Sequence, residues 1–262
     1  MTTGPTTSLA RTALNKVPEV TVFFWIIKIF ATTIGETAAD NLSEHLGLGL
    51  TGTTWVMTAV LAVALFFQFR ARRYVPVIYW LSVALLSVVG TLVTDNLTDK
   101  YNVSLTTSTI VFAIALACTF AAWYSVEHTL SIHSIDSPRR EAFYWLAILF
   151  TFALGTAVGD LIAEKFDVGY WKSALLFGGL ILLITIAWRW LHLNAILAFW
   201  MAYILTRPLG ASIGDYLSQK RVDGGLGLGT TTTSLVFLAG IVAIVIFLTI
   251  SKLDQVRSPT ET

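Results

Sequence analysis

An aspartate recurs four times at the same place in an apolar stretch, five residues after a glycine. The copies are Gly35 to Leu42 (GETAADNL), Gly90 to Leu97 (GTLVTDNL), Gly155 to Ile162 (GTAVGDLI) and Gly210 to Leu217 (GASIGDYL). Their glycines are 55, 65 and 55 residues apart. An ionisable side chain in an apolar segment is costly and marks an ion or proton path by default. Four equivalent copies therefore indicate one shared chemical task.

The helical period places three positions of each copy on one stripe, because residues four apart share a helix face. The stripes are Glu36, Asp40, Glu44; Thr91, Asp95, Asp99; Thr156, Asp160, Glu164; and Ala211, Asp215, Gln219. Successive positions lie about 6 Å apart along the helix. We expect the four Asp to converge on a common site with Glu36 beneath them. Glu44, Asp99, Glu164, Thr91 and Thr156 would line a path to it.

The chemistry of this site is that of a hard cation. Four or five carboxylates cannot all stay ionised at low dielectric unless protons or a cation offset them. Oxygen ligands, with no neighbouring Cys and no His in the apolar interior, favour magnesium, calcium or manganese over zinc or copper. Asn41 and Asn96 directly follow Asp40 and Asp95 and would add amide oxygens as metal ligands.

A second interpretation of the acidic residues is that they lie at the membrane interface. Each would then cap the next element or pair with Lys100, Lys165 or Lys220. For the outer acids Glu44, Asp99 and Glu164 the two interpretations stay open. For the four Asp we favour the shared site, because a surface cap would not need small residues beside it in every copy.

Small residues accompany each Asp. Gly35, Gly90, Gly155 and Gly210 are followed four residues later by Ala39, Thr94, Gly159 and Gly214. Small residues at this spacing let helices approach closely in lipid. Arg207 stands three residues before Gly210, where the other copies have Thr32, Ser87 and Phe152. We interpret Arg207 as a permanent counter-charge to the acids; the alternative is a cation that snorkels to a membrane face.

Composition sets the scaffold that must position these residues. The chain has 262 residues, of which 55% are hydrophobic and 13% charged, and long apolar runs recur throughout. This is typical of a polytopic membrane protein. We predict an all-α membrane protein with eight transmembrane helices built from four parallel two-helix repeats. The expected spans are residues 20–46, 53–69, 76–100, 105–127, 141–165, 171–191, 195–220 and 230–250.

The expected organisation is one transmembrane domain, residues 20–250, between cytoplasmic tails at 1–19 and 251–262. Its repeats cover about 20–70, 76–127, 141–191 and 195–250, and the first apolar run is expected to be a retained span rather than a signal peptide. One face carries ten basic residues: Arg11, Lys16, Arg70, Arg72, Arg73, Arg139, Arg140, Arg189, Lys252 and Arg257. The other carries five: Lys100, Lys165, Lys172, Lys220 and Arg221. The positive-inside rule then puts both termini in the cytoplasm.

Other functional classes find little support. The net charge of +1 gives no field that would favour nucleic acid. The glycine run ending at Gly229 lacks the lysine of a phosphate-binding loop, so no nucleotide is expected, and no haem is expected either. Intramembrane hydrolases need a Ser with a His or a His-rich metal site. The four histidines, His45, His128, His133 and His192, all lie near span ends or in linkers, so we do not expect an enzyme. The oligomeric state is open.

The repeated Gly35-Glu36…Asp40-Asn41 pattern, together with the Leu-Gly-Leu-Gly turns at residues 46–49 and 226–229, resembles a bacterial family of small repeat-containing membrane proteins. That family was long catalogued as uncharacterised membrane-anchored proteins, and some members are implicated in manganese export. The resemblance covers residues 20–250. It implies a multi-pass protein of the bacterial inner membrane that acts in manganese homeostasis, with the acidic motif residues as ligands.

Three functions remain for testing. The first is export of a divalent cation, with manganese favoured by the resemblance; protons could serve as the counter-ion. The second is proton-coupled transport of a small solute, in which the carboxylates carry protons and Trp25, Trp55, Trp80 and Trp171 shape a pocket. The third is a non-transporting membrane scaffold whose acids fix the register of the helices.

Overall fold

The computed structural model describes residues 15–45 and 47–255. Eight helices in this part of the chain are long and apolar enough to cross a membrane. They are α2 (Val22–His45), α3 (Gly49–Arg70), α4 (Pro76–Asp95), α5 (Leu105–Glu127), α6 (Pro138–Asp160), α7 (Tyr170–Trp190), α8 (Ala195–Ser218) and α9 (Thr230–Ser251). No strand is present among the described residues. The prediction of an all-helical membrane protein with two spans per repeat is confirmed.

The predicted ends of the spans differ from the observed ends by a few residues. α6 begins at Pro138 rather than 141, because the Ser137 hydroxyl accepts a hydrogen bond from the backbone N–H of Arg140 and proline fits the first helical position. α8 ends at Ser218, so Gln219 adopts an extended conformation and does not continue the fourth stripe.

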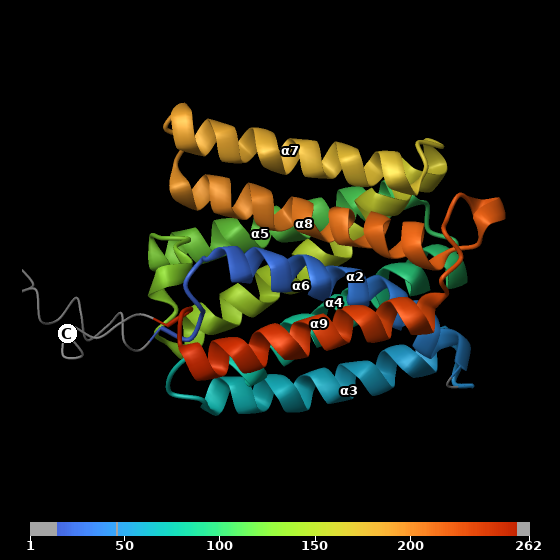
Figure 1. The fold of residues 1–262 in the computed structure, drawn as a ribbon. Coiled ribbons are helices and arrows are strands. Elements are labelled where there is room, and N and C mark those ends of the chain that lie inside the picture. The colour runs from blue at the N-terminus through green and yellow to red at the C-terminus, as the bar shows by residue number, and fades with distance from the viewer. Residues whose placement is uncertain (1–14, 46, 256–262) are drawn as a thin grey trace, which may run out of the picture.

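The eight helices form a central ring surrounded by an outer layer. The first helices of the repeats are α2, α4, α6 and α8, and 56–67% of the most apolar stretch of each is buried inside the protein. For the second helices, α3, α5, α7 and α9, the buried share is 11–22%. Each outer helix packs on the first helix of the next repeat: α3 on α4, α5 on α6, α7 on α8 and α9 on α2 (Figure 1). The last repeat thus closes back on the first.

The repeat glycines form the joints of the central ring. A Cβ added to any of the four would lie less than 3.0 Å from a side-chain atom of the next ring helix. The atoms concerned belong to Ser87 beside Gly35, Phe152 beside Gly90, Arg207 beside Gly155 and Thr32 beside Gly210. Each partner is the residue three before the glycine of the following repeat. One contact is therefore made four times around the axis, and it holds the four Asp-bearing helices at equal depth.

Two ring helices widen immediately after their Asp. Asn96–Lys100 and Leu161–Lys165 are π-helical turns that continue α4 and α6. The N–H of Tyr101 donates to the carbonyl of Asn96, and that of Phe166 to the carbonyl of Leu161, both at 3.0 Å. The four-residue stripe assumed for Asp99 and Glu164 is therefore wrong in detail, because the extra residue per turn rotates these side chains relative to Asp95 and Asp160. Such π-turns are frequent at functional sites.

Both ends of the described chain lie at the same end of the bundle. The N–H of Glu19 donates to the carbonyl of Asp254 at 2.9 Å, and the N–H of Lys16 donates to the carbonyl of Ile135 at 3.1 Å. The Lys16 ammonium is buried and pairs with Glu141 at 2.7 Å. Of the basic residues assigned to this end, Arg11 and Arg257 lie outside the described residues.

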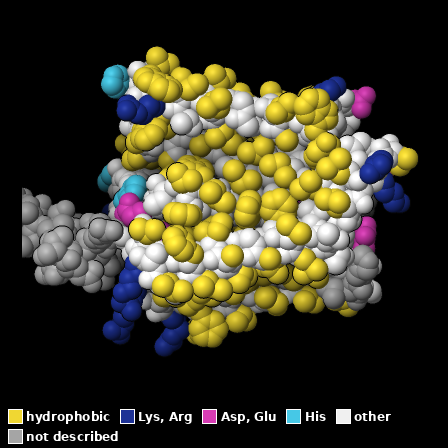
Figure 2. Space-filling view, viewed as in Figure 1, with side chains coloured by type: hydrophobic (Ala, Val, Ile, Leu, Met, Phe, Trp, Pro, Cys, Tyr) yellow, Lys and Arg dark blue, Asp and Glu magenta, His cyan; other side chains and the backbone are white. Residues whose placement is uncertain are grey.

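The surface matches a membrane environment. Figure 2 shows hydrophobic side chains across the middle of one face, with Lys, Arg, Asp and Glu gathered toward the two ends of the helices. Large apolar residues of the outer helices, such as Phe66 and Leu183, are more than half exposed. In water this surface would be unfavourable, whereas in lipid it is the expected exterior.

Candidate cation site

Three acidic residues from three repeats meet on the axis of the ring. Carboxylate oxygens of Glu36 on α2, Asp160 on α6 and Asp215 on α8 all lie within 4.8 Å of one another. Glu36 and Asp215 are buried, and Asp160 is half-buried. We call these three residues the carboxylate group. Its spacing suits one oxygen-coordinated cation placed between the side chains.

The remaining two Asp border this group. Asp40 follows Glu36 by one turn of α2, and Asp95 lies one turn of α4 after Thr91, a buried residue whose hydroxyl accepts from Arg207. Asp40 and Asp95 are half-buried. Within residues 15–45 and 47–255, no hydrogen bond or ion pair engages the side-chain carboxylates of the four Asp. Of the four Asp that the sequence predicts to converge, the structure brings Asp160 and Asp215 together with Glu36. A single site shared by all four Asp stays a prediction.

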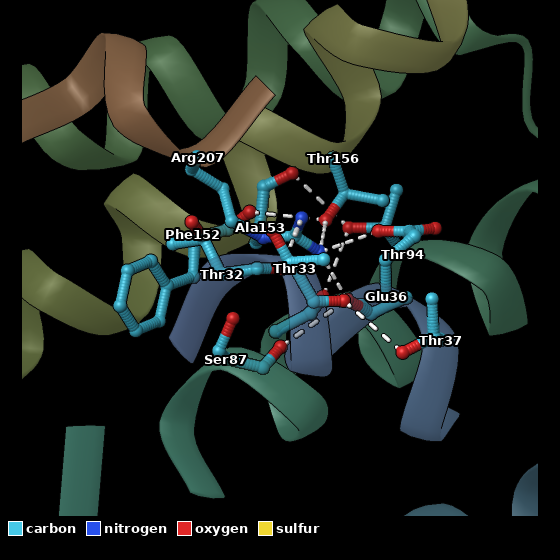
Figure 3. A network of polar contacts seen from close by, with 12 residues as sticks. Thr32, Thr33, Glu36, Thr37, Ser87, Thr94, Phe152, Ala153, Thr156 and Arg207 are labelled. Atoms are coloured by element: carbon cyan, nitrogen blue, oxygen red, sulfur yellow. Dashed lines mark hydrogen bonds and ion pairs between the residues drawn. The ribbon is translucent and has the colours of Figure 1, made fainter. Parts of the chain in front are cut away.

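Arg207 is the fixed positive charge beside the group. Its side chain is fully buried and donates from one terminal nitrogen to Glu36 Oε2 at 2.7 Å. The same nitrogen donates to the hydroxyls of Thr156, at 2.7 Å, and Thr91. Figure 3 shows the guanidinium reaching across the axis to Glu36 and Thr156. Arg207 therefore lies inside the ring as a counter-charge, and the snorkelling alternative is wrong.

Thr91 and Thr156 hold Arg207 in place. Both are fully buried and stand at the level of Glu36 in their own repeats. Their hydroxyls accept from the guanidinium and donate to backbone carbonyls one turn back, those of Ser87 and Phe152. The sequence placed these threonines along a path. In this structure they instead contact Arg207, whose side chain blocks the axis next to the carboxylate group on the side of the termini.

Exposure rises stepwise from this level toward the turns within the repeats. The residues at the Glu36 level are buried, the Asp level is mostly half-buried, and Glu44, Asp99 and Glu164 are exposed. The nearby lysines do not neutralise these acids: Lys100 donates to Thr51 at 2.6 Å and Lys165 to Thr106 at 2.7 Å. In the described residues, neither lysine forms an ion pair with an Asp or Glu.

The two asparagines expected to be ligands contact the outer helices. The Asn96 amide nitrogen donates to Thr54 Oγ1 at 2.7 Å, and its oxygen accepts from Thr51 at 2.7 Å. The Asn41 amide nitrogen donates to Thr231 at 2.5 Å. Residues directly after an Asp point about 100° away from it around the helix. Asn96 is thus a wrong assignment as a metal ligand, and the hydrogen bond of Asn41 likewise ties it to α9.

The small residues four positions after each repeat glycine play unequal parts. At Gly159 an added Cβ would make only ordinary contacts, the nearest being 3.6 Å from Pro208 Cα. At Gly214 it would lie 3.1 Å from Thr37 and 3.2 Å from the carbonyl of Thr33, which is tight. The close packing of neighbouring ring helices therefore depends on the four repeat glycines and on Gly214, and less on Gly159.

Lys28 is a buried charge that the sequence analysis missed. It lies in α2 with 0% of its surface exposed, and its Nζ has no hydrogen-bond partner among the described residues. The Nζ stands 3.9 Å from the ring centre of Phe152 and 4.1 Å from that of Tyr203. A lysine within an apolar run eight residues before Glu36 was the available signal.

A repeated aromatic pair fills the axis beyond Lys28. It consists of Phe24-Trp25, Tyr79-Trp80, Tyr144-Trp145 and Phe199-Trp200, with the same 55, 65 and 55 residue spacings as the glycines. The first ring of each pair contacts the tryptophan of the next repeat, and centroid distances are 5.5, 5.5, 6.3 and 5.7 Å around the ring. The spacing was visible in the sequence and would have identified this layer.

The four tryptophans expected to shape one solute pocket lie in two different places: Trp25 stands with Trp80 beside Phe24, and the other two are on outer helices. Trp80 is 2% exposed and belongs to the axial layer, whereas Trp55 and Trp171 are 73% and 51% exposed on outer helices. That pocket prediction is wrong, because the second helix of each repeat faces lipid. Tryptophans near the ends of spans are typical interfacial anchors.

Comparison with known proteins identifies the repeat but no activity. The family model described as a Repeat of Unknown Function (DUF347) matches residues 23–74, 78–129, 143–193 and 198–254. No curated protein and no solved structure matches the chain. Each matched segment contains one ring helix and the outer helix that follows it. Because the four matches cover most of the sequence, the chain belongs to the DUF347 repeat family and contains four copies of its repeat.

Proposed function

We propose that this protein exports a divalent cation, with Mn²⁺ as the first candidate, through the carboxylate group of Glu36, Asp160 and Asp215. The observation that carries the proposal is the approach of three carboxylates from three repeats to within 4.8 Å inside a membrane domain. Asp40 and Asp95 border the site and supply further oxygens. The ion is the transported substrate rather than a resident cofactor.

The charge arrangement supports a cation over a neutral solute. The acidic residues on the axis outnumber the buried cations Arg207 and Lys28, so the site attracts positive charge. Oxygen ligands without sulfur or imidazole suit hard divalent ions. Arg207 already occupies one Glu36 oxygen, so an entering ion competes with a tethered guanidinium for this residue. Such competition keeps binding weak enough for release.

Export, rather than import, is supported by the resemblance to bacterial membrane proteins implicated in manganese export. The location that we propose is the bacterial cytoplasmic membrane, with both termini inside. The excess of basic residues at the end that carries the termini supports this orientation. A cytoplasmic ion would then cross the aromatic layer, reach the carboxylate group and leave past Glu44, Asp99 and Glu164.

The test is a pair of neutral substitutions, Asp160→Asn with Asp215→Asn, in cells challenged with Mn²⁺. Elemental analysis should find less manganese in cells that express the wild type than in empty cells, and no reduction with the double variant. The purified variant should bind Mn²⁺ at least 100-fold more weakly in calorimetry, since loss of supporting residues alone costs 10–100-fold. Asp223→Asn, in an exposed turn, is the matched control and should behave as wild type.

Two results would contradict the proposal. If the double variant reduces cellular manganese as well as the wild type at equal membrane abundance, the carboxylate group is not the path. If the purified wild type binds none of Mn²⁺, Mg²⁺ and Ca²⁺, the acids serve helix register and the scaffold function gains the support.

A further inference from the structure

Lys28 has no role in the binding of a cation as described so far, yet its placement is costly. Its Nζ is enclosed in the ring, without an acceptor in hydrogen-bond range among the residues that the structure describes. A buried charge of this kind persists in membrane helices when it serves a function. The corresponding residues of the other ring helices are Val83, Ile148 and Tyr203, so the helical scaffold itself does not require a cation here.

The surroundings of Lys28 balance its two protonation states. The faces of Phe152 and Tyr203 stabilise an ammonium through cation–π contacts. Complete burial without an acceptor among the described residues works against the ammonium, and so does the positive charge of Arg207, whose guanidinium donates to the Thr32 carbonyl one turn along α2. A change in charge nearby can therefore decide which form is present. Unlike arginine, lysine can give up its proton when it is buried.

Among the described residues at this level of the ring, Lys28 is the one suited to release a proton, as the groups around it show. From α8 come Arg207, which stays protonated in proteins, and Tyr203, whose buried phenol keeps its proton because a phenolate would be an unpaired charge in an apolar interior. Tyr79 of α4 and Tyr144 of α6 lie one turn further toward the termini, and their hydroxyls bond each other at 2.5 Å. α9, which packs on α2, carries no titratable side chain between Thr230 and Ser251. On α2 itself, Glu36 is the next ionisable residue.

Arg207 connects Lys28 to the carboxylate group. It pairs with Glu36 on one side and repels Lys28 on the other. A divalent ion that takes over the Glu36 oxygen adds two positive charges about 12 Å from Lys28, eight residues along α2. It also leaves the Arg207 charge without its partner. Both effects act against a second ammonium in the same low-dielectric interior.

We propose that Lys28 is the proton-exchange group of the transporter, which releases a proton when a divalent cation occupies the carboxylate group. An N–H bond of the ammonium breaks, its electron pair stays on nitrogen as the amine forms, and the proton passes to a water molecule that enters the axis with the hydrated cation. When the cation leaves, the amine takes up a proton again. Export is thereby coupled to proton movement in the opposite direction. This inference rests on the proposed cation transport.

The experiment counts protons released per cation bound. Calorimetric titration of the purified full-length protein with Mn²⁺, in buffers of different ionisation enthalpy, gives this number directly. Lys28→Met should release one proton fewer than wild type at unchanged binding stoichiometry. Lys172→Met, an exposed lysine, is the matched control and should keep the wild-type count. A merely structural lysine would alter stability without altering the count.

Lys28→Arg provides a second, independent test. The arginine fits a cation site but keeps its proton, so it should also release one proton fewer. Because its charge cannot be removed, it should weaken Mn²⁺ binding by about tenfold or more. A third test needs no variant: in wild-type protein with ¹³Cε-labelled lysine, Mg²⁺ as a diamagnetic ion should shift one lysine resonance toward the amine value.

The outcomes separate the two proposals. If the wild-type protein binds no divalent ion, both the proposed cation site and the proposed exchange role of Lys28 are wrong. If wild type binds Mn²⁺ and the Lys28 variants release the same number of protons as wild type, the exchange role is wrong while the cation site stands. The exchange role is equally wrong if cation binding shifts no lysine resonance.

Discussion

The four ring helices build two unlike halves on one axis. Toward the turns within the repeats, the axial positions carry Glu36, which pairs with Arg207 through one oxygen, and the four Asp, whose carboxylates have no hydrogen-bond partner among the described residues. Toward the termini, the same helices carry Phe or Tyr followed by Trp, and each ring packs on the next repeat. Because both halves use the same helices and the same joints, their difference comes from side chains alone. One half is built to hold charge, and the other to close the axis.

The boundary between the halves is where the repeats stop being equivalent. The positions beside the repeat glycines are Thr32, Ser87, Phe152 and Arg207, and only the last is charged. One turn further toward the termini stands Lys28, also in a single copy. A four-fold charge on the axis would repel itself, whereas one residue of each kind can offset the acids without crowding. The scaffold is repeated, but its charged boundary is asymmetric.

The largest loss of stability is expected from a substitution of Arg207 at this boundary. Arg207→Met removes one partner of a buried ion pair and leaves Glu36 uncompensated, which should cost about 3–5 kcal/mol of stability. The double variant Glu36→Gln with Arg207→Met should recover part of this loss, because no unpaired charge remains. Thermal unfolding in detergent measures both. Equal stability of the single and double variants would show that the pair does not support the acidic half.

A smaller effect is expected at the joints that the two halves share. Gly35→Ala would drive a Cβ into Ser87 of the next helix, and overpacking of this kind costs about 1–3 kcal/mol. Gly159→Ala is the matched control, since its Cβ meets only ordinary contacts and should be nearly neutral. Unfolding curves of the two variants measure the difference. If both glycines tolerate alanine equally, the ring does not depend on its joints.

The smallest effect is expected within the aromatic half. Tyr144→Phe removes a buried hydroxyl bonded to Tyr79 at 2.5 Å, which should cost about 1 kcal/mol. Phenylalanine fits, because Phe24 and Phe199 hold this place in other repeats. Since the change lies away from the carboxylates, calorimetry should find Mn²⁺ affinity within about twofold of wild type. A large loss of affinity would mean that the two halves are not separate in function.

Much of the fold could be predicted because it depends on local and repeated signals. The lengths of the apolar runs predicted the spans, and the spacing of the glycines predicted the repeats. The constant distance from Gly to Asp predicted that the acids lie at one level of the membrane domain. Two residues show the limits of that approach. Asn96 follows Asp95 in the chain but turns to α3, since neighbours in a helix face different ways. Lys28 was overlooked because one basic residue hardly changes the hydropathy of a span.

The sequence by itself determined eight membrane helices in four repeats and the recurrence of an acid at one depth in each, because hydrophobic length and helical period are properties of the chain. Only the tertiary structure decided which acids meet, which helix packs on which, and what Arg207 and Lys28 face. These depend on how the fourth repeat closes against the first. Contacts between residues as far apart as Glu36 and Arg207 arise from ring closure, and no local pattern encodes the distance between their side chains.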